Sequence, residues 1–202
     1  MNTGTTYLGI RLEFERGTGI MKIILISGKA EAGKTTTAKF LKKKLEEQGM
    51  LSAIIPYGQY VKDTAKMIFD WDGNKDEKGR ALLQWWGTDI VRKNYPDFWI
   101  DTVIRLAKVM NKMNFDFLII DDCRFPNEIE DWKRDIFDVW DVMTVRIERP
   151  GHENALTEKQ RQHPSECALD GYNFDVTISA TNQEELEYAI CEQLLPKIDG
   201  LD

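Results

Sequence analysis

Residues 22–49 read KIILISGKAEAGKTTTAKFLKKKLEEQG, a short apolar run followed by a glycine-containing turn and a lysine-rich stretch. The apolar run predicts a strand over residues 22–27. The lysine-rich stretch predicts a helix over residues 34–48, because Gly49 suits the left-handed position that follows many helices. A strand, a turn and a helix in direct succession are the first unit of an α/β fold.

The turn in this stretch has the spacing of a phosphate-binding loop. Four residues separate Gly28 from Gly33, and Lys34 and Thr35 follow at once, as in G-x-x-x-x-G-K-[ST]. Backbone amides of such a loop and the N-terminus of the next helix face one anion. Lys34 is expected to reach the outer phosphates of ATP, and the Thr35 hydroxyl is expected to ligate Mg²⁺. The predicted cofactor-binding residues are Gly28, Lys29, Ala30, Glu31, Ala32, Gly33, Lys34, Thr35 and Thr36. The alternative is a glycine turn with a solvated lysine.

A second informative stretch is FLIIDDCRFPNE, residues 117–128. Its apolar run places Asp121 and Asp122 at the carboxyl end of a predicted strand, where doubly wound sheets bind ligands. There the carboxylates could hold Mg²⁺ directly or through water, so the predicted metal ligands are Thr35, Asp121 and Asp122. Arg124 is expected to point into the same crevice. In the alternative interpretation, Asp122 caps a turn and Arg124 is its surface partner.

The third stretch is RALLQWWGTDIVRKNYPDFWID, residues 80–101. Its polar residues recur every four positions and form a stripe along one helix. The stripe consists of Arg80, Gln84, Thr88 and Arg92. Gly87 inside the helix costs about 1 kcal/mol relative to alanine, which indicates a close approach by another element. Two alternatives stay open: the stripe is a solvated face, and the tryptophans, including Trp99, are core residues.

The fourth stretch is RIERPGHENALTEKQRQHPSE, residues 146–166. It contains a capping box, Thr157 with Gln160, that predicts a short helix ending before Pro164. A polar segment that carries arginines at the end of a strand would suit a closing lid near residues 149–165. The alternative is a long surface loop. His163 is expected to be structural.

The chain as a whole alternates strands and helices, which predicts a three-layer α/β fold with a five-stranded parallel sheet. Strands are expected near 22–27, 51–56, 116–121, 142–148 and 174–179, and helices near 34–48, 59–69, 79–94, 98–113, 128–135 and 183–194. Two helix starts are predicted from the reciprocal capping pairs Asn127 with Glu130 and Thr181 with Glu184. Residues 21–202 are expected to form a single domain. Residues 1–20 are expected to be an N-terminal extension, either non-native or the product of an upstream start.

Composition excludes several classes of protein. The net charge of −7 argues against a protein that coats nucleic acid. No apolar run approaches the roughly 18 to 20 residues of a membrane span, and residues 1–20 lack the features of a secretory signal. Three widely separated cysteines lack the spacing of a zinc or redox motif, so we expect a reduced, cytoplasmic compartment. The expected partners are small-molecule nucleotides, with no nucleic acid and no membrane, and a homodimer stays open.

From Met21 to Leu195, the chain resembles the phage-type deoxynucleoside monophosphate kinases of the P-loop nucleoside monophosphate kinase superfamily. The resemblance is carried by GKAEAGKT, LLQWWGTDIVRKNYPDFW, DDCRFPNE and HPSE, followed by FDVTI and a last helix. It implies that Gly33, Lys34 and Thr35 hold ATP and magnesium, and that an acceptor site is lined by Arg92, Asp122 and Arg124. The chain departs from the family at residues 179–182, SATN, where an asparagine and glycine turn is expected.

The resulting hypothesis is ATP- and Mg²⁺-dependent phosphorylation of a deoxynucleoside monophosphate. An acceptor phosphate is largely ionised at neutral pH, so cations that bring two anions together are needed and a general base is not. The predicted catalytic residues are Lys34, Asp122, Arg124, Arg149 and Arg161, and the predicted substrate-binding residues are Lys62, Arg80, Gln84, Thr88, Arg92, Trp99 and Arg124. The alternatives are a kinase for another phosphorylated acceptor, such as phosphomevalonate, and a nucleotide-dependent switch ATPase.

Overall fold

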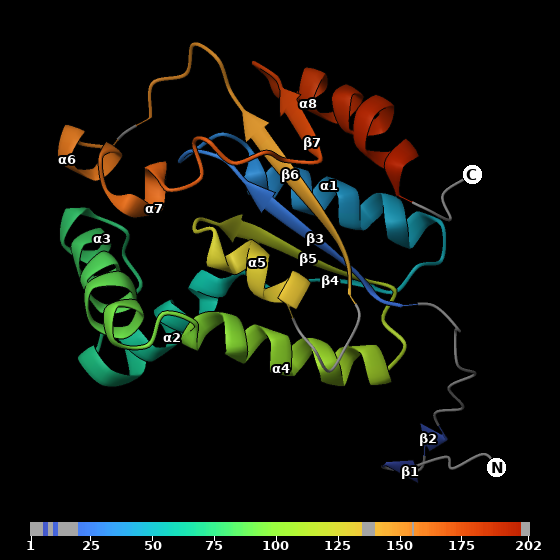
Figure 1. Ribbon diagram of the computed structural model, residues 1–202, viewed down its shortest axis with the longest axis horizontal. Helices are drawn as coiled ribbons and strands as arrows, with labels where there is room; N and C mark the ends of the chain where they lie inside the picture. The colour runs from blue at the N-terminus through green and yellow to red at the C-terminus, as the bar shows by residue number, and fades with distance from the viewer. Residues whose placement is uncertain (1–5, 8–9, 12–19, 135–139, 155, 199–202) are drawn as a thin grey trace.

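The protein is described by a computed structural model that covers residues 6–7, 10–11, 20–134, 140–154 and 156–198 (Figure 1). Within the first nineteen residues, Thr6–Tyr7 (β1) pairs antiparallel with Ile10–Arg11 (β2). Apart from Ile20, the rest of the predicted extension lies outside the described residues.

Five parallel strands form the central sheet, in the order β4-β5-β3-β6-β7. They are β3 (Lys22–Ser27), β4 (Ser52–Ile54), β5 (Phe117–Cys123), β6 (Asp141–Glu148) and β7 (Val176–Ser179). At the centre of the sheet, Ile24 pairs with Ile119 on one side and with Met143 on the other. The predicted α/β fold with a five-stranded parallel sheet is confirmed.

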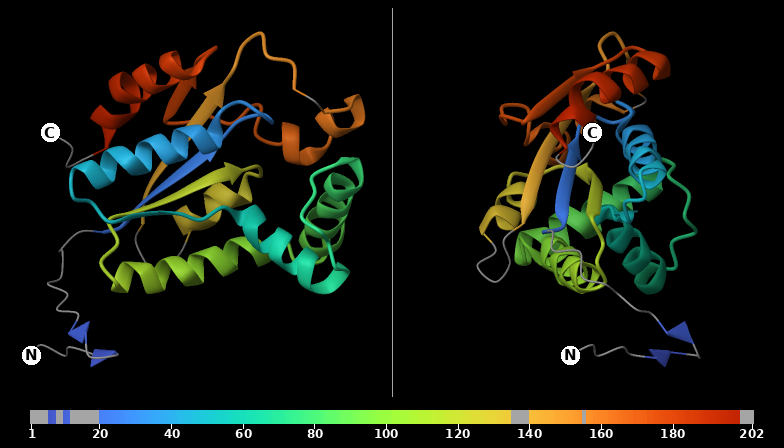
Figure 2. Two further views of the ribbon diagram at one scale, coloured as in Figure 1. Left: turned by 180° about the vertical axis from the view of Figure 1, so that it is seen from behind. Right: turned by 90° about the vertical axis from the view of Figure 1, so that its right-hand side faces the viewer.

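Strand β3 has an unbroken apolar run from Ile23 to Ile26 because both of its faces are covered. Ile24 and Ile26 pack into one hydrophobic core, whereas Ile23 and Leu25 pack into the other. This division follows from the period of two residues along a strand. Figures 1 and 2 show helices α1 and α8 on the first face of the sheet, and α4 and α5 on the second.

The helices follow the predicted pattern with small shifts at their ends. They are α1 (Lys34–Glu47), α2 (Tyr57–Phe69), α3 (Glu77–Gln84), α4 (Phe98–Lys112), α5 (Asn127–Arg134), α6 (Glu158–Arg161), α7 (Pro164–Cys167) and α8 (Gln183–Ala189). Wider, π-helical turns continue α3 as η1 (Trp85–Arg92) and α8 as η2 (Ile190–Leu194), and the short 3₁₀-helix η3 (Leu195–Lys197) follows. No described helix has the length and apolar character needed to cross a bilayer.

One predicted helix start is confirmed and another is shifted. The Thr157–Gln160 capping box begins α6 as expected. The cap of α8 lies one residue later than predicted: Asn182 accepts from the Glu185 amide at 3.0 Å. Thr181 precedes this cap, and its own amide donates to the Glu185 carboxylate at 2.8 Å.

The predicted reciprocal pair at the start of α5 makes other contacts. The amide side chain of Asn127 bonds to Asp97 and Arg92, and the Glu130 carboxylate accepts from the Tyr172 hydroxyl at 2.8 Å. These partners come from distant parts of the chain, so the local spacing alone misassigned both side chains.

Helices α3, α6 and α7 stand together at the carboxyl-end edge of the sheet, where the strand arrows point (Figures 1 and 2). The phosphate-binding loop ends β3 at the same edge. The predicted segments therefore converge at one end of the molecule.

Candidate active site

The loop from Gly28 to Thr35 connects β3 to α1 as predicted. A Cβ atom at Gly28 would lie 2.5 Å from the carbonyl oxygen of Ile147, so the loop can run against β6 only with glycine there. Gly33 has φ +103°, a left-handed conformation that side chains other than hydrogen rarely tolerate. Both glycines of the motif are thus required by geometry.

The Lys34 side chain is buried inside this loop. Its ammonium group donates to the carbonyl oxygens of Gly28 and Lys29 at 2.8 and 2.7 Å. Burial, with a smaller contribution from the nearby positive charge of Arg124, lowers the pKa of Lys34 to about 7. Because this pKa is close to neutral pH, an anion that binds beside Lys34 strongly favours its charged form.

Two of the three predicted metal ligands lie together. The Thr35 hydroxyl donates to the buried Asp121 carboxylate at 2.6 Å. Mg²⁺ commonly takes one or two protein oxygens and completes its shell with phosphates and water. Among the described residues, three or more histidines, cysteines or carboxylates nowhere gather into a metal site. A magnesium ion here would therefore rely on Thr35, Asp121 and phosphate oxygens.

Asp122, the third predicted metal ligand, has a structural task. Its two carboxylate oxygens accept from the amides of Tyr57 and Gly58, at 2.8 and 2.7 Å, and so cap the N-terminus of α2. Burial raises the pKa of Asp122, while these two hydrogen bonds oppose the rise. This arrangement matches the alternative interpretation of Asp122 as a cap. Asp122 also borders a cavity together with Lys34 and Thr35, and its metal and catalytic roles stay predictions. The cap also explains why α2 begins at Tyr57, two residues before the predicted start.

The predicted polar stripe faces a cavity of about 680 Å³ rather than open solvent. All four stripe residues line this cavity, namely Arg80, Gln84, Thr88 and Arg92. Lys62 and Lys75 line it as well, as do Lys34 and Thr35 of the loop. A spacing of four residues is slightly more than one turn of an α-helix, which takes 3.6 residues. The same spacing is slightly less than one of the wider turns of η1. The two drifts oppose each other, which keeps the stripe straight.

The glycine inside this helix marks a close approach, as predicted. A Cβ atom on Gly87 would lie 2.9 Å from Cγ1 of Val61, so η1 packs directly on α2. The Gly87 carbonyl accepts from the indole of Trp99 at 3.1 Å. Trp99 lines the cavity but is 2 % exposed, so it is a core wall and has no free face for stacking on a base.

Sequence reasoning missed a buried carboxylate, Glu128, that organises the side of the cavity around Arg92. It pairs with the guanidinium of Arg92 and accepts from the backbone amides of Arg124 and Phe125. Arg92 also lies over the Phe125 ring, with its guanidinium carbon 4.1 Å from the centroid. Burial raises the pKa of Glu128, and the Arg92 charge opposes the rise. The available signal was a glutamate beside two apolar residues, Ile129 and Trp132, in a segment predicted to be helical.

The two predicted lid arginines do not line the large cavity. Arg149 donates to the carbonyl oxygen of Thr181 at 3.3 Å and borders a separate cavity of about 270 Å³ beside the loop. Arg161 donates to the carbonyl oxygen of Asn154 at 3.1 Å. Carbonyl groups hold both arginines in this structure, and their catalytic roles stay predictions. From the predicted lid segment, the cavity is lined by Leu156, Gln160 and Ser165.

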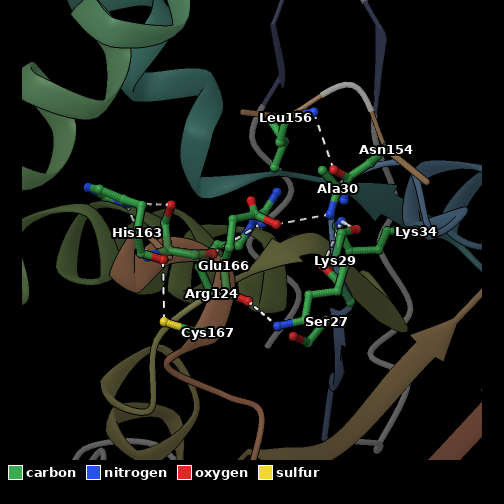
Figure 3. Close-up of polar contacts among 12 residues, drawn as sticks. Ser27, Lys29, Ala30, Lys34, Arg124, Asn154, Leu156, His163, Glu166 and Cys167 are labelled. Atoms are coloured by element: carbon green, nitrogen blue, oxygen red, sulfur yellow. Dashed lines mark hydrogen bonds and ion pairs between the residues drawn. The ribbon is translucent and has the colours of Figure 1, made fainter. Parts of the chain in front are cut away.

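Arg124 reaches the mouth of the loop, where the segment 163–170 holds it. Its guanidinium donates to the carbonyl oxygen of Ser165 at 3.1 Å and pairs with the Glu166 carboxylate. The other oxygen of Glu166 accepts from the Ala30 amide at 3.0 Å. Figure 3 shows Glu166 between Arg124 and the loop residues. His163 is structural, as expected, because its ring accepts from the Ser165 amide at the start of α7.

Comparison with known proteins gives one relative and several structures. Phosphomevalonate kinase of Drosophila melanogaster is 28 % identical over 193 residues, which cover 89 % of this chain and 97 % of the relative. A Thermus thermophilus protein of known structure has a TM-score of 0.50 at 15 % identity and covers 90 % of this chain and 100 % of its own. A Chloroflexus aurantiacus protein proposed to be a kinase has a TM-score of 0.51 at 12 % identity, with 87 % and 96 % covered. No family model matches the chain.

The chain has the P-loop kinase fold. The relative and the loop geometry together support a phosphotransferase of this class, with ATP as the general phosphoryl donor. Both the resembled family and the relative phosphorylate a compound that already carries phosphate.

Proposed function

We propose that this protein transfers a phosphoryl group from ATP, with Mg²⁺, to a deoxynucleoside monophosphate and forms the diphosphate. One observation carries the proposal: the phosphate-binding loop and a second set of cations line the same cavity. The second set consists of Lys62, Lys75, Arg80, Arg92 and Arg124. Arg92 and Arg124 are paired with Glu128 and Glu166, and a second bound anion would explain why Lys62, Lys75 and Arg80 line the same cavity as well.

The division of labour follows from the positions of these groups. Lys34 and the loop amides would hold the donor phosphates, and Thr35 with Asp121 would hold the metal ion. Bound Mg²⁺ would neutralise charge on the donor phosphates during transfer. The acceptor phosphate would lie against Arg92, whose guanidinium presents parallel donors to phosphate oxygens.

No general base is required by this proposal. The attacking oxygen belongs to a phosphate whose second pKa is about 6, so it is already ionised at neutral pH. The residues of the cavity therefore act by placing the two phosphates in line and by stabilising the negative charge between them.

A second candidate acceptor is phosphomevalonate. It is favoured by the Drosophila relative, whose sequence is matched over nearly its whole length. The cavity is also rich in cations, while Trp99 is a buried wall, and this suits an acceptor with a second anionic group as well as one with a base. A switch ATPase is less favoured, because it would not need the cations opposite the loop.

A panel assay tests the proposal. The protein is incubated with ATP, Mg²⁺ and one acceptor at a time, using each deoxynucleoside monophosphate, each ribonucleotide and phosphomevalonate, and the diphosphate product is measured. Product from one or more deoxynucleoside monophosphates supports the proposal. Product from phosphomevalonate alone would replace it with the second candidate, and ATP loss that is independent of every acceptor would favour a switch. The Lys34→Met variant checks that activity belongs to this loop.

A further inference from the structure

The Glu166 carboxylate lies where the loop should meet an anion. One oxygen accepts from the Ala30 amide at 3.0 Å, and the other pairs with the guanidinium of Arg124 (Figure 3). The side chain is 9 % exposed and borders the large cavity beside Lys34. A loop amide and an arginine are the donors that phosphate oxygens use in sites of this kind.

The segment that carries Glu166 is fastened to the loop at further points. The Lys29 ammonium group donates to the Glu166 carbonyl oxygen at 2.7 Å and to the Asp170 carboxylate at 2.6 Å. Arg146 on β6 also donates to Asp170, at 3.2 Å. The carboxylate is therefore held against the loop by a well-anchored segment, and its position is not that of a freely turning surface side chain.

Donor phosphates and this carboxylate compete for the same surroundings. ATP brings several negative charges to the loop, and like charges at a few ångströms in a partly buried cavity repel strongly. The N–H groups of Arg124 that donate to Glu166 and Ser165 are ones that a transferring phosphate would need. Either the carboxylate moves or donor binding is weakened.

We propose that Glu166 is a positioning residue that takes the place of a phosphate oxygen in the free protein and gives way when the donor binds. While it is in place, it keeps the Ala30 amide satisfied and holds Arg124 at the loop mouth. When phosphates displace it, Arg124 is released toward the reacting groups. This inference rests on the proposed function, because it requires ATP at the loop.

The size of the effect follows from populations. If the free protein spends only a fraction of its time with Glu166 withdrawn, the apparent Kd of the donor is raised by the inverse of that fraction. Removing the carboxylate should therefore tighten donor binding. The gain would be about threefold if Glu166 is withdrawn roughly a third of the time, and about tenfold if it is withdrawn roughly a tenth of the time. A residue with a purely structural role would leave donor affinity unchanged or weaken it when replaced.

Calorimetric titration with a non-hydrolysable ATP analogue and Mg²⁺ tests this. The variants are Glu166→Gln, which keeps the shape, and Glu166→Ala, which avoids placing an amide NH₂ group against the arginine. The matched control is Glu148→Gln, because it removes an exposed carboxylate beside the smaller cavity without touching Ala30 or Arg124.

The inference is supported if both Glu166 variants bind the analogue at least threefold more tightly while the control stays within twofold. In turnover assays, the KM for ATP should fall and the KM for the acceptor should change much less. Thermal unfolding shows whether each Glu166 variant folds. If one of the two does not fold, the binding result of the folded variant decides the test. Equal or weaker binding by the folded Glu166 variants overturns the inference alone. A wild-type protein that does not bind the analogue overturns the proposed function as well.

Discussion

We predict that ATP binding is accompanied by proton uptake, because the Lys34 amine is buried. Burial and the Arg124 charge lower its pKa to about 7 in the free protein, so near pH 8 only about one amine in ten is charged. Phosphates bound at the loop favour the charged form and raise this pKa. The complex therefore holds more protons than the free protein, and binding at pH 8 should take up roughly 0.9 of a proton.

The sign of the pH dependence follows from the same linkage. Because the complex binds the extra proton, affinity for ATP falls as pH rises above the pKa of the free lysine. The loss should reach about twofold at pH 7 and about tenfold at pH 8, relative to acidic conditions in which Lys34 is already charged. It levels off at the higher pKa of the complex.

Calorimetry in buffers of different ionisation enthalpy measures this uptake, since the slope of the observed heat against that enthalpy is the number of protons taken up. A non-hydrolysable analogue at pH 8 and above avoids titration of the nucleotide itself. Lys29→Met, which changes the same loop but leaves Lys34 in place, should retain the uptake. The reasoning is refuted if the wild-type protein takes up no proton at pH 8, or if the Lys29 variant abolishes the uptake.

Three further predictions concern single side chains. Arg92→Lys should raise the KM for the acceptor and lower kcat/KM by about tenfold to a hundredfold, because lysine cannot reproduce two parallel hydrogen bonds. Thr35→Val keeps the shape of the side chain but removes the hydroxyl. If this ligand contributes ~1.5 kcal/mol to Mg²⁺ binding, the Mg²⁺ concentration for half-maximal activity should rise about tenfold in steady-state assays. Gly87→Ala should lower the melting temperature, because the new Cβ would lie 2.9 Å from Val61. Each kcal/mol of lost unfolding free energy should lower it by about 2–4 °C.

Each of these predictions has its own control. For Arg92→Lys, the KM for ATP should stay near the wild-type value, and an equal loss on both substrates would make the arginine structural. A Thr35 variant with an unchanged Mg²⁺ requirement would remove this hydroxyl from the metal site. Adding Val61→Ala to Gly87→Ala should restore part of the lost stability, since it removes the clashing methyl groups; no recovery would show that the contact is not limiting.

Local patterns were sufficient for the parts of the site that lie close together in sequence. The loop between β3 and α1 needs only glycine spacing and an adjoining strand and helix, and the stripe that ends at Arg92 needs only helical periodicity. Both were found where the patterns predicted them. The closeness of Thr35 and Asp121 also depends on β5 lying beside β3, and the alternation of strands and helices does not predict this strand order.

Tertiary partners account for what the sequence left undetermined. Asp122 caps a helix that begins 65 residues earlier in the chain, at Tyr57, and such a partner leaves no trace in local spacing. Glu128 gains its importance from Arg92, 36 residues away. Arg149 and Arg161 are bound by nearby carbonyl groups, which compete with any role at the loop. A side chain between two candidate partners cannot be assigned until the distances are known.

The position of β3 at the middle of the sheet has a consequence for how the chain reaches its native state during synthesis. This strand emerges first among the five, yet its neighbours β5 and β6 follow roughly a hundred residues later, as the pairing of Ile24 with Ile119 and Met143 requires. Contacts of such long range are slow to form, because the intervening chain must be ordered before they stabilise it. A nascent chain that stops before β6 would leave an apolar strand edge uncovered and open to aggregation. We therefore expect the nucleotide loop to become competent only after about three quarters of the polypeptide has left the ribosome.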